Sequence, residues 1–292
     1  MRRTALIAIL ALVCLTVPAR ADLPPLAGWF PVPTYPYAVL AHSDGSVWVG
    51  TAGSVLRYTP EGTLLGTVAG FASAGLAEAP GGDVIVLDYW SRVAHRYSSA
   101  GALVHSWPIT PAQREGGRVV VDPDGNIYVL CFTSGFVTSA IVKYDALGNQ
   151  LAILPGLTGS AGLALSGGLL YCSEIYAGQV HAYTLALEPA GTFANPAIYG
   201  TGLGSDAAGN LIQPDFYGHL AYLLDSGGAT LGAFDPRGVG GYPAQWSPVA
   251  ADESSDHTYF IADQHNWYIA VFRSAAVPVA TESWGDVKAA YR

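Results

Sequence analysis

The sequence predicts an all-β protein, a six-bladed β-propeller whose blades are four-stranded antiparallel sheets. A unit with strand-like patterning recurs six times along the 292 residues, and its first turn falls at Gly45, Gly82, Gly125, Gly168, Gly209 and His257. Repeats of roughly 40 residues are typical of propeller blades. The 35 glycines and 19 prolines suit short strands joined by tight turns. No segment before the C-terminus has a convincing helical period.

Residues 1–21 have the pattern of a secretory signal peptide. Arg2 and Arg3 precede an apolar run from Ala5 to Val17, and a small-x-small site ends at Ala21. We therefore expect cleavage after Ala21 and a periplasmic or secreted protein without membrane insertion, an uncleaved anchor being the alternative. The propeller is expected over residues 22–280, followed by a short tail over 281–292.

Each unit follows the same order of strands and turns. An apolar inner strand, such as Tyr37–Ala41 or Val119–Val121, leads into a glycine-rich turn. A second strand then alternates β-branched and aromatic residues, as in Val47–Val49. The third strand ends in an aromatic residue, which is Tyr58, Tyr97, Tyr144, Tyr183 or Phe272. A further glycine opens the outer strand in four units, at Gly62, Gly101, Gly148 and Gly228.

The sixth unit lacks a glycine-led outer strand after Phe272. An open ring would expose sheet edges. The extended segment Trp29–Val32 precedes the first unit, and we expect it to complete the last blade and close the ring. The alternative is that Val277–Ala280 forms this strand.

Charge and cysteine content narrow the possible partners. The net charge is −9 and only 12% of residues are charged, with no basic run after the first three positions. Nucleic acid is excluded as a partner, because binding it needs clustered Lys and Arg. Counting along their strands places Cys131 and Cys172 on the same side of their respective sheets. Neighbouring blades pack opposite sides together, so the two thiols should not meet. We therefore expect both to be buried free thiols.

One column of the repeat is acidic. It contains Asp88, Glu174, Asp215 and Asp263, with Thr51 and Cys131 in the remaining units. A ring of carboxylates could bind a cation, but a repeated column more often records a repeated structural need. We expect each carboxylate to accept backbone N–H bonds in its own turn. His95 and His181 lie in blades that are not adjacent, so a shared zinc is not expected.

The two rims of the predicted disc differ in composition. Turns after the inner strands are small and polar, whereas the opposite rim is rich in aromatic residues, which suit contacts with sugars, peptides or proteins. Filling of the gaps between blades is the alternative role. The candidate ligand-binding residues are Tyr37, Tyr89, Trp90, Arg114, Glu115, Tyr176, Tyr199, Tyr217, Tyr242, Trp246 and Trp267.

Two segments resemble the NHL repeat, namely Val86–Val104 and Ile261–Phe272. Both contain a strand ending in Asp, a short turn, and a strand ending in an aromatic residue. Only Arg92 and Asn266 match the Asn and Arg that this family usually carries in the turn. The resemblance implies a six-bladed propeller and says little about activity.

From these features we expect a non-catalytic scaffold that binds a protein, peptide or glycan through the aromatic face. The alternative is a propeller enzyme of the lactonase or streptogramin-lyase kind, which implies a metal in the axial funnel. No cofactor, metal ligand set or catalytic residue is predicted, because the inner strands are apolar. Their few acidic residues lie near the polar turns, at Glu78, Asp122, Asp206 and Asp252.

Overall fold

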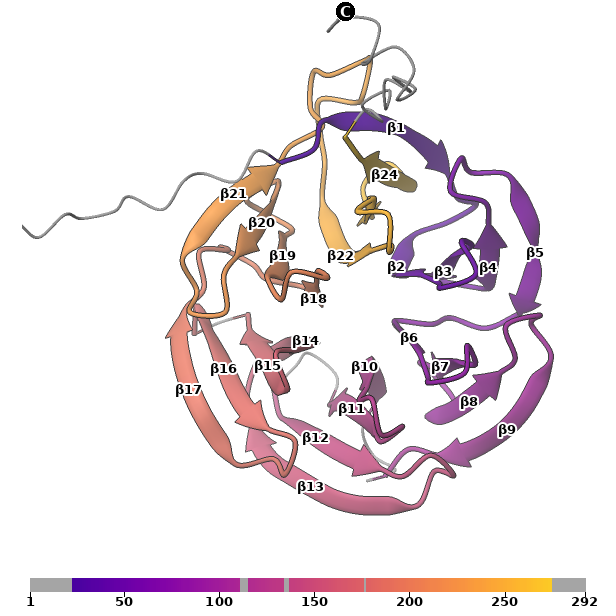
Figure 1. Ribbon diagram of the computed structural model, residues 1–292, viewed down its shortest axis with the longest axis vertical. Coiled ribbons are helices and arrows are strands. Elements are labelled where there is room, and N and C mark those ends of the chain that lie inside the picture. Colours follow the sequence, from indigo (N-terminus) through magenta and orange to yellow (C-terminus); the bar gives the residue numbers. More distant parts are fainter. Residues whose placement is uncertain (1–22, 111–114, 134–136, 176, 275–292) are drawn as a thin grey trace, which may run out of the picture.

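The computed structural model describes residues 23–110, 115–133, 137–175 and 177–274, without the side chains of residues 115 and 116. It confirms the six-bladed propeller: six four-stranded antiparallel sheets surround one axis (Figure 1). These ranges contain no helix, and so no helix long and apolar enough to cross a membrane. The predicted signal peptide, the C-terminal tail, Arg114 and Tyr176 lie outside the described residues.

In five of the six blades the strands follow one another outward from the axis in the order in which they occur in the chain. The first three blades contain β2 (Pro36–Ala41), β3 (Val47–Thr51), β4 (Val55–Tyr58) and β5 (Leu64–Ala69); β6 (Gly75–Glu78), β7 (Val84–Asp88), β8 (Val93–Tyr97) and β9 (Leu103–Pro108); and β10 (Glu115–Val121), β11 (Ile127–Phe132), β12 (Ser139–Tyr144) and β13 (Gln150–Leu157). The next two contain β14 (Ser160–Ser166), β15 (Leu169–Glu174), β16 (Gln179–Thr184) and β17 (Pro189–Ala194); and β18 (Gly204–Ser205), β19 (Leu211–Asp215), β20 (Leu220–Leu224) and β21 (Thr230–Phe234).

The last blade is closed by the N-terminal strand, as expected. It contains β22 (Pro248–Glu253), β23 (Tyr259–Asp263) and β24 (Tyr268–Phe272), and its outer strand is β1 (Leu26–Pro31). Strand β1 pairs with β24 in an antiparallel ladder from Leu26 opposite Phe272 to Pro31 opposite Tyr268. We call β1 the clasp strand, because it joins the two ends of the ring.

The first turn of each unit needs a left-handed residue, which explains the glycine that marks the repeat. Gly45, Gly82 and Gly125 have φ values of 85°, 87° and 84°. A residue without Cβ takes this conformation without strain. His257 holds the equivalent position with φ of 60°, so the sixth unit makes the same turn with a less suitable residue.

The core lies between blades, where the faces of neighbouring sheets pack together. Cys131 packs with Ile85 and Leu87 of the preceding blade, and Cys172 packs with Tyr128 and Leu130 of its own preceding blade. Both thiols are buried and neither forms a disulfide, which confirms the prediction. Burial raises the pKa of Cys172 to about 12, so the thiol stays protonated.

Candidate functional site

Two cavities open along the propeller axis, one at each face. The larger, of about 510 Å³, lies at the aromatic rim and is called the funnel here. The smaller, of about 270 Å³, is bounded by the inner strands and is called the polar-mouth cavity. Arg118 lines both cavities, so its side chain lies between them.

The funnel wall is mainly aromatic and aliphatic. Its polar side chains are those of Tyr37, Tyr89, Tyr199, Tyr217, Thr201, Gln264 and Arg118, with the indole of Trp90. No Asp or Glu belongs to this wall among the described residues. A pocket of this size with apolar walls and a few polar groups is typical of a small-molecule site.

The structure brings five of the predicted ligand-binding residues together at the funnel. They are Tyr37, Tyr89, Trp90, Tyr199 and Tyr217. Trp90 and Tyr217 are 70% and 60% exposed, so both rings are largely in solvent. Tyr199 packs against Tyr217 with ring centroids 4.8 Å apart. Five of the eleven predicted residues therefore line one cavity, and their role in ligand binding stays a prediction.

Tyr242 and Trp246 lie in the core instead of the funnel. Both are buried, and they pack with Phe272 in the cluster between the fifth and sixth blades. The Tyr242 hydroxyl donates to Asp263 Oδ2 at 2.7 Å. For these two aromatics the alternative role, filling the gap between wedge-shaped blades, is the one observed.

The remaining predicted residues lie apart from the funnel wall or outside the description. Trp267 is 39% exposed and packs edge-on against Tyr35, with ring centroids 5.2 Å apart, and neither residue lines the funnel. Arg114 and Tyr176 fall in undescribed segments. Glu115 begins β10, but its side chain is not described.

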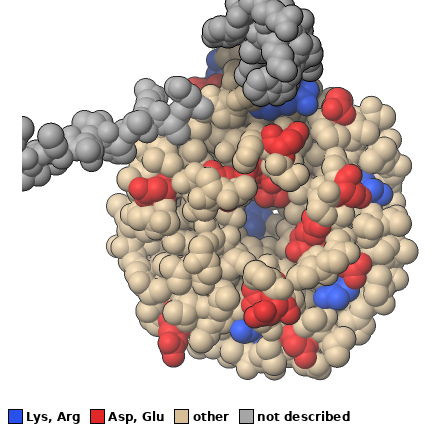
Figure 2. Space-filling view, in the orientation of Figure 1, with Lys and Arg blue, Asp and Glu red and all other residues tan. Residues whose placement is uncertain are grey.

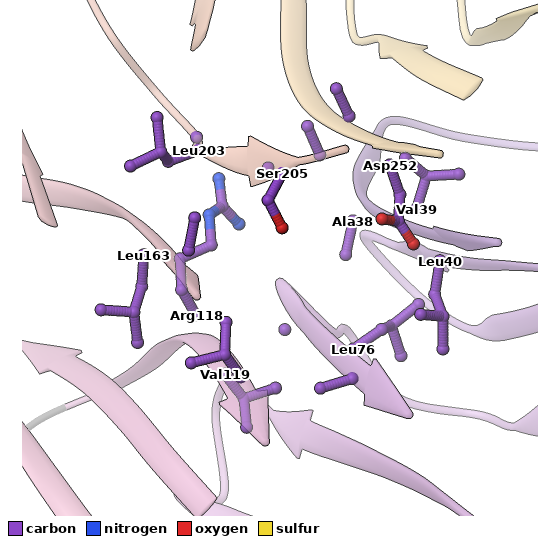
Figure 3. A pocket seen from close by; sticks show the side chains of 18 of the residues that line it. Ala38, Val39, Leu40, Leu76, Arg118, Val119, Leu163, Leu203, Ser205 and Asp252 are labelled. Carbon is purple, nitrogen blue, oxygen red and sulfur yellow. The ribbon is translucent and has the colours of Figure 1, made fainter. Parts of the chain in front are cut away.

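Arg118 is the central residue of the axis, and our sequence analysis did not identify it. Its side chain extends from β10 toward the centre, near residues of other inner strands (Figure 3). Nη1 donates to the carbonyl oxygens of Tyr37, Ala74 and Gly117 at 3.2, 2.5 and 3.3 Å. Nη2 donates to those of Thr201 and Val249 at 2.5 and 3.3 Å. Burial lowers the pKa of the guanidinium to about 10, which leaves it charged at neutral pH.

One group of Arg118 is left over. Its Nε–H is buried and has no hydrogen-bond partner among the described residues. A buried donor without an acceptor is unfavourable by about 1–3 kcal/mol. The enclosed Nε–H does not reach the solvent in the funnel.

The repeat itself contained a signal for Arg118. The six residues at this inner-strand position are Ala38, Gly75, Arg118, Gly162, Gly202 and Ala250. Five are the smallest residue types and one is the longest cation. Such a column indicates an axis too narrow for six side chains but able to hold one.

Asp88, Asp215 and Asp263 of the acidic column accept backbone N–H bonds in their own turns, as we expected, whereas Glu174 contacts His181 Nε2 at 3.4 Å. Asp88 Oδ1 accepts the N–H groups of Trp90 and Ser91 at 3.0 and 3.1 Å. Asp215 accepts those of Ile198 and Tyr199 at 2.8 and 3.0 Å, which holds a funnel-lining tyrosine in place. These carboxylates therefore position the aromatic rim and do not converge on a metal.

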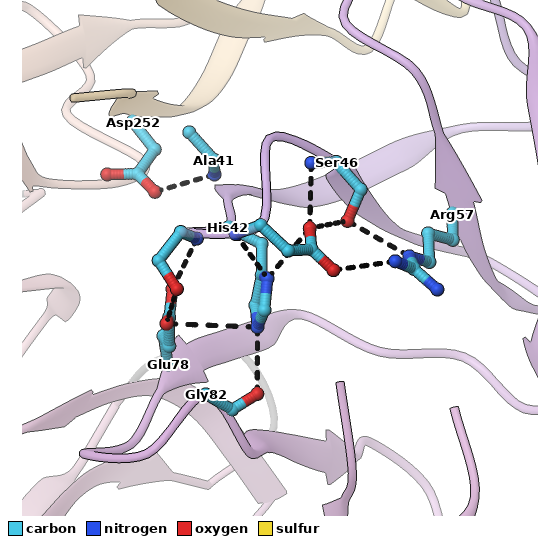
Figure 4. A network of polar contacts seen from close by, with 9 residues as sticks. Ala41, His42, Ser46, Arg57, Glu78, Gly82 and Asp252 are labelled. Carbon is cyan, nitrogen blue, oxygen red and sulfur yellow. Dashed lines mark hydrogen bonds and ion pairs between the residues drawn. The ribbon is translucent and has the colours of Figure 1, made fainter. Parts of the chain in front are cut away.

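The polar face is built from contacts that join the first two blades (Figure 4). The buried His42 ring contacts the Gly82 carbonyl through Nε2 at 2.8 Å and accepts from Asp44 N–H through Nδ1 at 3.1 Å. Nδ1 also lies 2.9 Å from Asp44 Oδ1, and Nε2 lies 3.8 Å from Glu78 Oε1. Ser43 binds Glu78 through both its backbone and its hydroxyl. These contacts join the first two blades. Among the described residues, no serine hydroxyl is hydrogen-bonded to His42.

Asp252 gives the polar mouth a pH dependence that can be measured. Its Oδ2 accepts from Ala41 N–H at 2.8 Å, and burial raises its pKa to about 7, with repulsion from Glu253 and Glu78 adding to the effect. The pKa of an aspartate in an unfolded chain is about 3.9. Between these values the folded protein holds a proton that the unfolded chain has released, so its free energy of unfolding falls as pH rises.

We predict that Asp252→Asn removes the fall of the free energy of unfolding with rising pH. At pH 8 the variant should be more stable than the parent by roughly 1–3 kcal/mol, and near pH 4 the two should be equal. Urea unfolding across this pH range measures the difference. Glu61→Gln, at an exposed outer turn, is the matched control and should follow the parent. Parallel curves for the parent and Asp252→Asn would contradict the prediction.

The residues of the axis do not fit the metal that the enzyme alternative implies. Within the described ranges, no group of three or more His, Cys, Asp or Glu side chains is placed to hold a metal ion. The guanidinium of Arg118 already occupies the axial carbonyl oxygens and would repel a second cation. The positive charge at this position belongs to the chain itself.

The comparisons with known proteins come from structure alone, since no family model and no curated protein matches the chain. The chain is similar to a gluconolactonase from Xanthomonas campestris, with 15% identity, a TM-score of 0.69, and coverage of 88% of this chain and 97% of that one. It is similar to a streptogramin B lyase at 16% identity and a TM-score of 0.61, over 84% and 96% of the two chains. A virginiamycin B lyase from Staphylococcus aureus shows 13% identity and a TM-score of 0.57, over 84% and 98%.

These neighbours correct our main functional expectation. The named similar structures are enzymes, which overturns the non-catalytic scaffold and favours the enzyme alternative. The NHL label is not confirmed and stays a prediction. At these identities the likeness establishes the fold, which is that of six-bladed propellers that include a gluconolactonase and streptogramin B lyases.

Proposed function

We propose that the chain is an exported propeller enzyme that opens a small lactone or related ester in the funnel. The observation that carries this proposal is the funnel itself: about 510 Å³, with aromatic walls and one partly buried guanidinium at its inner end. The likeness to a gluconolactonase and to streptogramin B lyases supports the same class of reaction. The turns that contain Arg92 and Asn266 support grouping the repeat with the NHL type.

The aromatic wall would bind the body of the substrate. Tyr37, Tyr89 and Tyr199 come from different blades and line one cavity, so a ring-shaped molecule would contact several flat faces at once. Aromatic side chains provide large contact area and a polar edge. The exposed rings of Trp90 and Tyr217 would contact the part of the substrate that lies nearest to solvent.

The polar groups at the inner end would stabilise the charge that forms during ring opening. In hydrolysis, a water oxygen bonds to the lactone carbonyl carbon and the ring C–O bond breaks, which yields a hydroxy acid. Negative charge collects on the carbonyl oxygen in the transition state, and preorganised donors lower its energy. The Tyr37 hydroxyl is suited to this role, and the positive charge of Arg118 at the inner end would add to it. Burial raises the pKa of Tyr37, which keeps its hydroxyl proton in place.

The test is a panel of small lactones and aryl esters with the product identified by mass. Hydrolysis adds the mass of one water, whereas elimination leaves the mass unchanged, so the two ring-opening routes are distinguished. Activity should survive a chelator, because Arg118 supplies the positive charge.

We predict that Tyr37→Phe lowers kcat/KM by about tenfold or more through the loss of one donor. Tyr35→Phe is the matched control, because this tyrosine lies outside the funnel wall, and it should leave kcat/KM unchanged. Steady-state kinetics on the best substrate of the panel measure both variants. Equal kinetics in the two variants, or no turnover of any substrate in the panel, would contradict the proposed function.

A further inference from the structure

The axis contains an unusual group of main-chain carbonyls. Five carbonyl oxygens from five different blades converge on one guanidinium. Three of them belong to Tyr37, Gly117 and Val249, which are the residues that the pairing register of their inner strands skips. A bulged residue leaves the strand ladder and re-aims its backbone. The bulges therefore direct carbonyl oxygens toward the axis.

The inner strands also leave space for only one long side chain. A Cβ added to Gly202 would lie 2.4 Å from the Val249 carbonyl oxygen, and one added to Gly75 would lie 2.7 Å from the Leu87 side chain. Both positions must therefore stay small. Arg118 fills the space that this column leaves at the centre.

Arg118 has no ion pair with an acidic side chain among the described residues, so the carbonyl oxygens are what compensates its charge. A buried charge without such compensation would be strongly unfavourable. Conversely, five carbonyl oxygens facing each other need a cation or water between them. The guanidinium of Arg118 and the five carbonyl oxygens therefore stabilise each other.

We propose that the axis of this propeller is a cation-binding site made of main-chain carbonyls, and that Arg118 is its built-in ligand. Once the side chain is removed, the site should take a small cation from solution. Neutral carbonyls replace the water shell of weakly hydrated ions more readily than that of Mg²⁺, so guanidinium ions and K⁺ are the class expected to bind. This inference does not rest on the proposed catalytic function.

The polar mouth offers a route to this site. Glu78 and Asp252 line the cavity that ends at Arg118. Figure 2 shows acidic side chains gathered around the central opening of the displayed face, with a basic side chain inside it. Carboxylates around a narrow opening raise the local concentration of cations.

The test is chemical rescue of Arg118→Ala, followed by thermal unfolding. The variant should melt about 10 °C or more below the parent, because it loses the group that joins five blades. Millimolar methylguanidinium chloride should raise its melting temperature by several degrees, KCl should do so more weakly, and MgCl₂ should not. None of these salts should shift the parent. Arg57→Ala, which removes a surface arginine paired with Asp44, is the control and should show no rescue.

Two outcomes would overturn the proposal: an Arg118→Ala protein that responds to no cation, or a parent that responds equally. If Arg118→Ala does not fold, Arg118→Lys and Arg118→Met decide. Lysine keeps a positive charge near the carbonyls and methionine does not, so the lysine variant should melt several degrees higher. Equal melting temperatures for these two variants would also overturn the carbonyl site.

Discussion

A chain that begins at Pro33, and therefore lacks the clasp strand, is expected to lose its cooperative thermal unfolding. Phe30 and Val32 are buried in the cluster that joins the first and last blades, and Phe30 packs against Tyr58 with ring centroids 5.1 Å apart. Burial of two such side chains contributes about 3–5 kcal/mol. With the lost ladder to β24, the change is comparable to the whole stability of many domains.

The loss also opens the ring. Without β1, strand β24 becomes an uncovered edge, and exposed edges promote association between chains. Far-UV circular dichroism during heating, together with size-exclusion chromatography, should show early, non-cooperative melting and larger species. A chain that begins at Asp22, where signal cleavage is predicted, is the matched control and should melt as one cooperative unit.

A peptide spanning residues 23–33 should restore the truncated chain. It supplies the missing strand, so saturating peptide should stabilise the folded ring by mass action. The same peptide with Phe30→Ala should rescue less well, because the aromatic side chain fills the gap next to Gly62. A truncated chain that melts like the control would show that three strands are enough for the last blade.

The clasp strand was predictable because the sequence shows both the missing strand and the segment that can replace it. The repeat had one unit without an outer strand and one extended segment without a partner, and closure of a ring leaves only one place for it. The turns were predictable for a similar reason, since positive φ at Gly45 or Gly82 is a requirement of the backbone itself. Features that a single residue type imposes on its own turn can be recognised in the sequence.

The funnel was only partly predictable, because sequence position does not determine the direction of a side chain in a long connection. Tyr199 and Tyr242 both precede an inner strand, yet Tyr199 lines the funnel and Tyr242 packs in the core. The carboxylates they meet decide the outcome: Asp215 binds the backbone N–H of Tyr199, whereas Asp263 binds the hydroxyl of Tyr242. Arg118 was missed because its role depends on five other strands being small or bulged at the same level.

Asp263→Ala is expected to be among the most destabilising single substitutions in the chain. This carboxylate is fully buried and accepts from the Tyr242 hydroxyl at 2.7 Å, from Ser247 N–H at 3.1 Å and from Asn266 Nδ2 at 2.6 Å. Alanine would leave these donors without their acceptor in a closed space. Loss of one partner from such a buried network is unfavourable by about 3–5 kcal/mol.

The repeat provides a matched control at the equivalent position. Asp88 accepts from two backbone N–H groups in an exposed turn, where water can replace it, so Asp88→Ala should be unfavourable by only about 1 kcal/mol. Urea unfolding of both variants measures the difference. Gln264 follows Asp263 and lines the funnel, so Asp263→Ala should also impair turnover of any lactone substrate. Equal losses of stability in the two variants would contradict the prediction. They would mean that both carboxylates only stabilise their own turns, and that the burial of Asp263 in the last blade adds nothing.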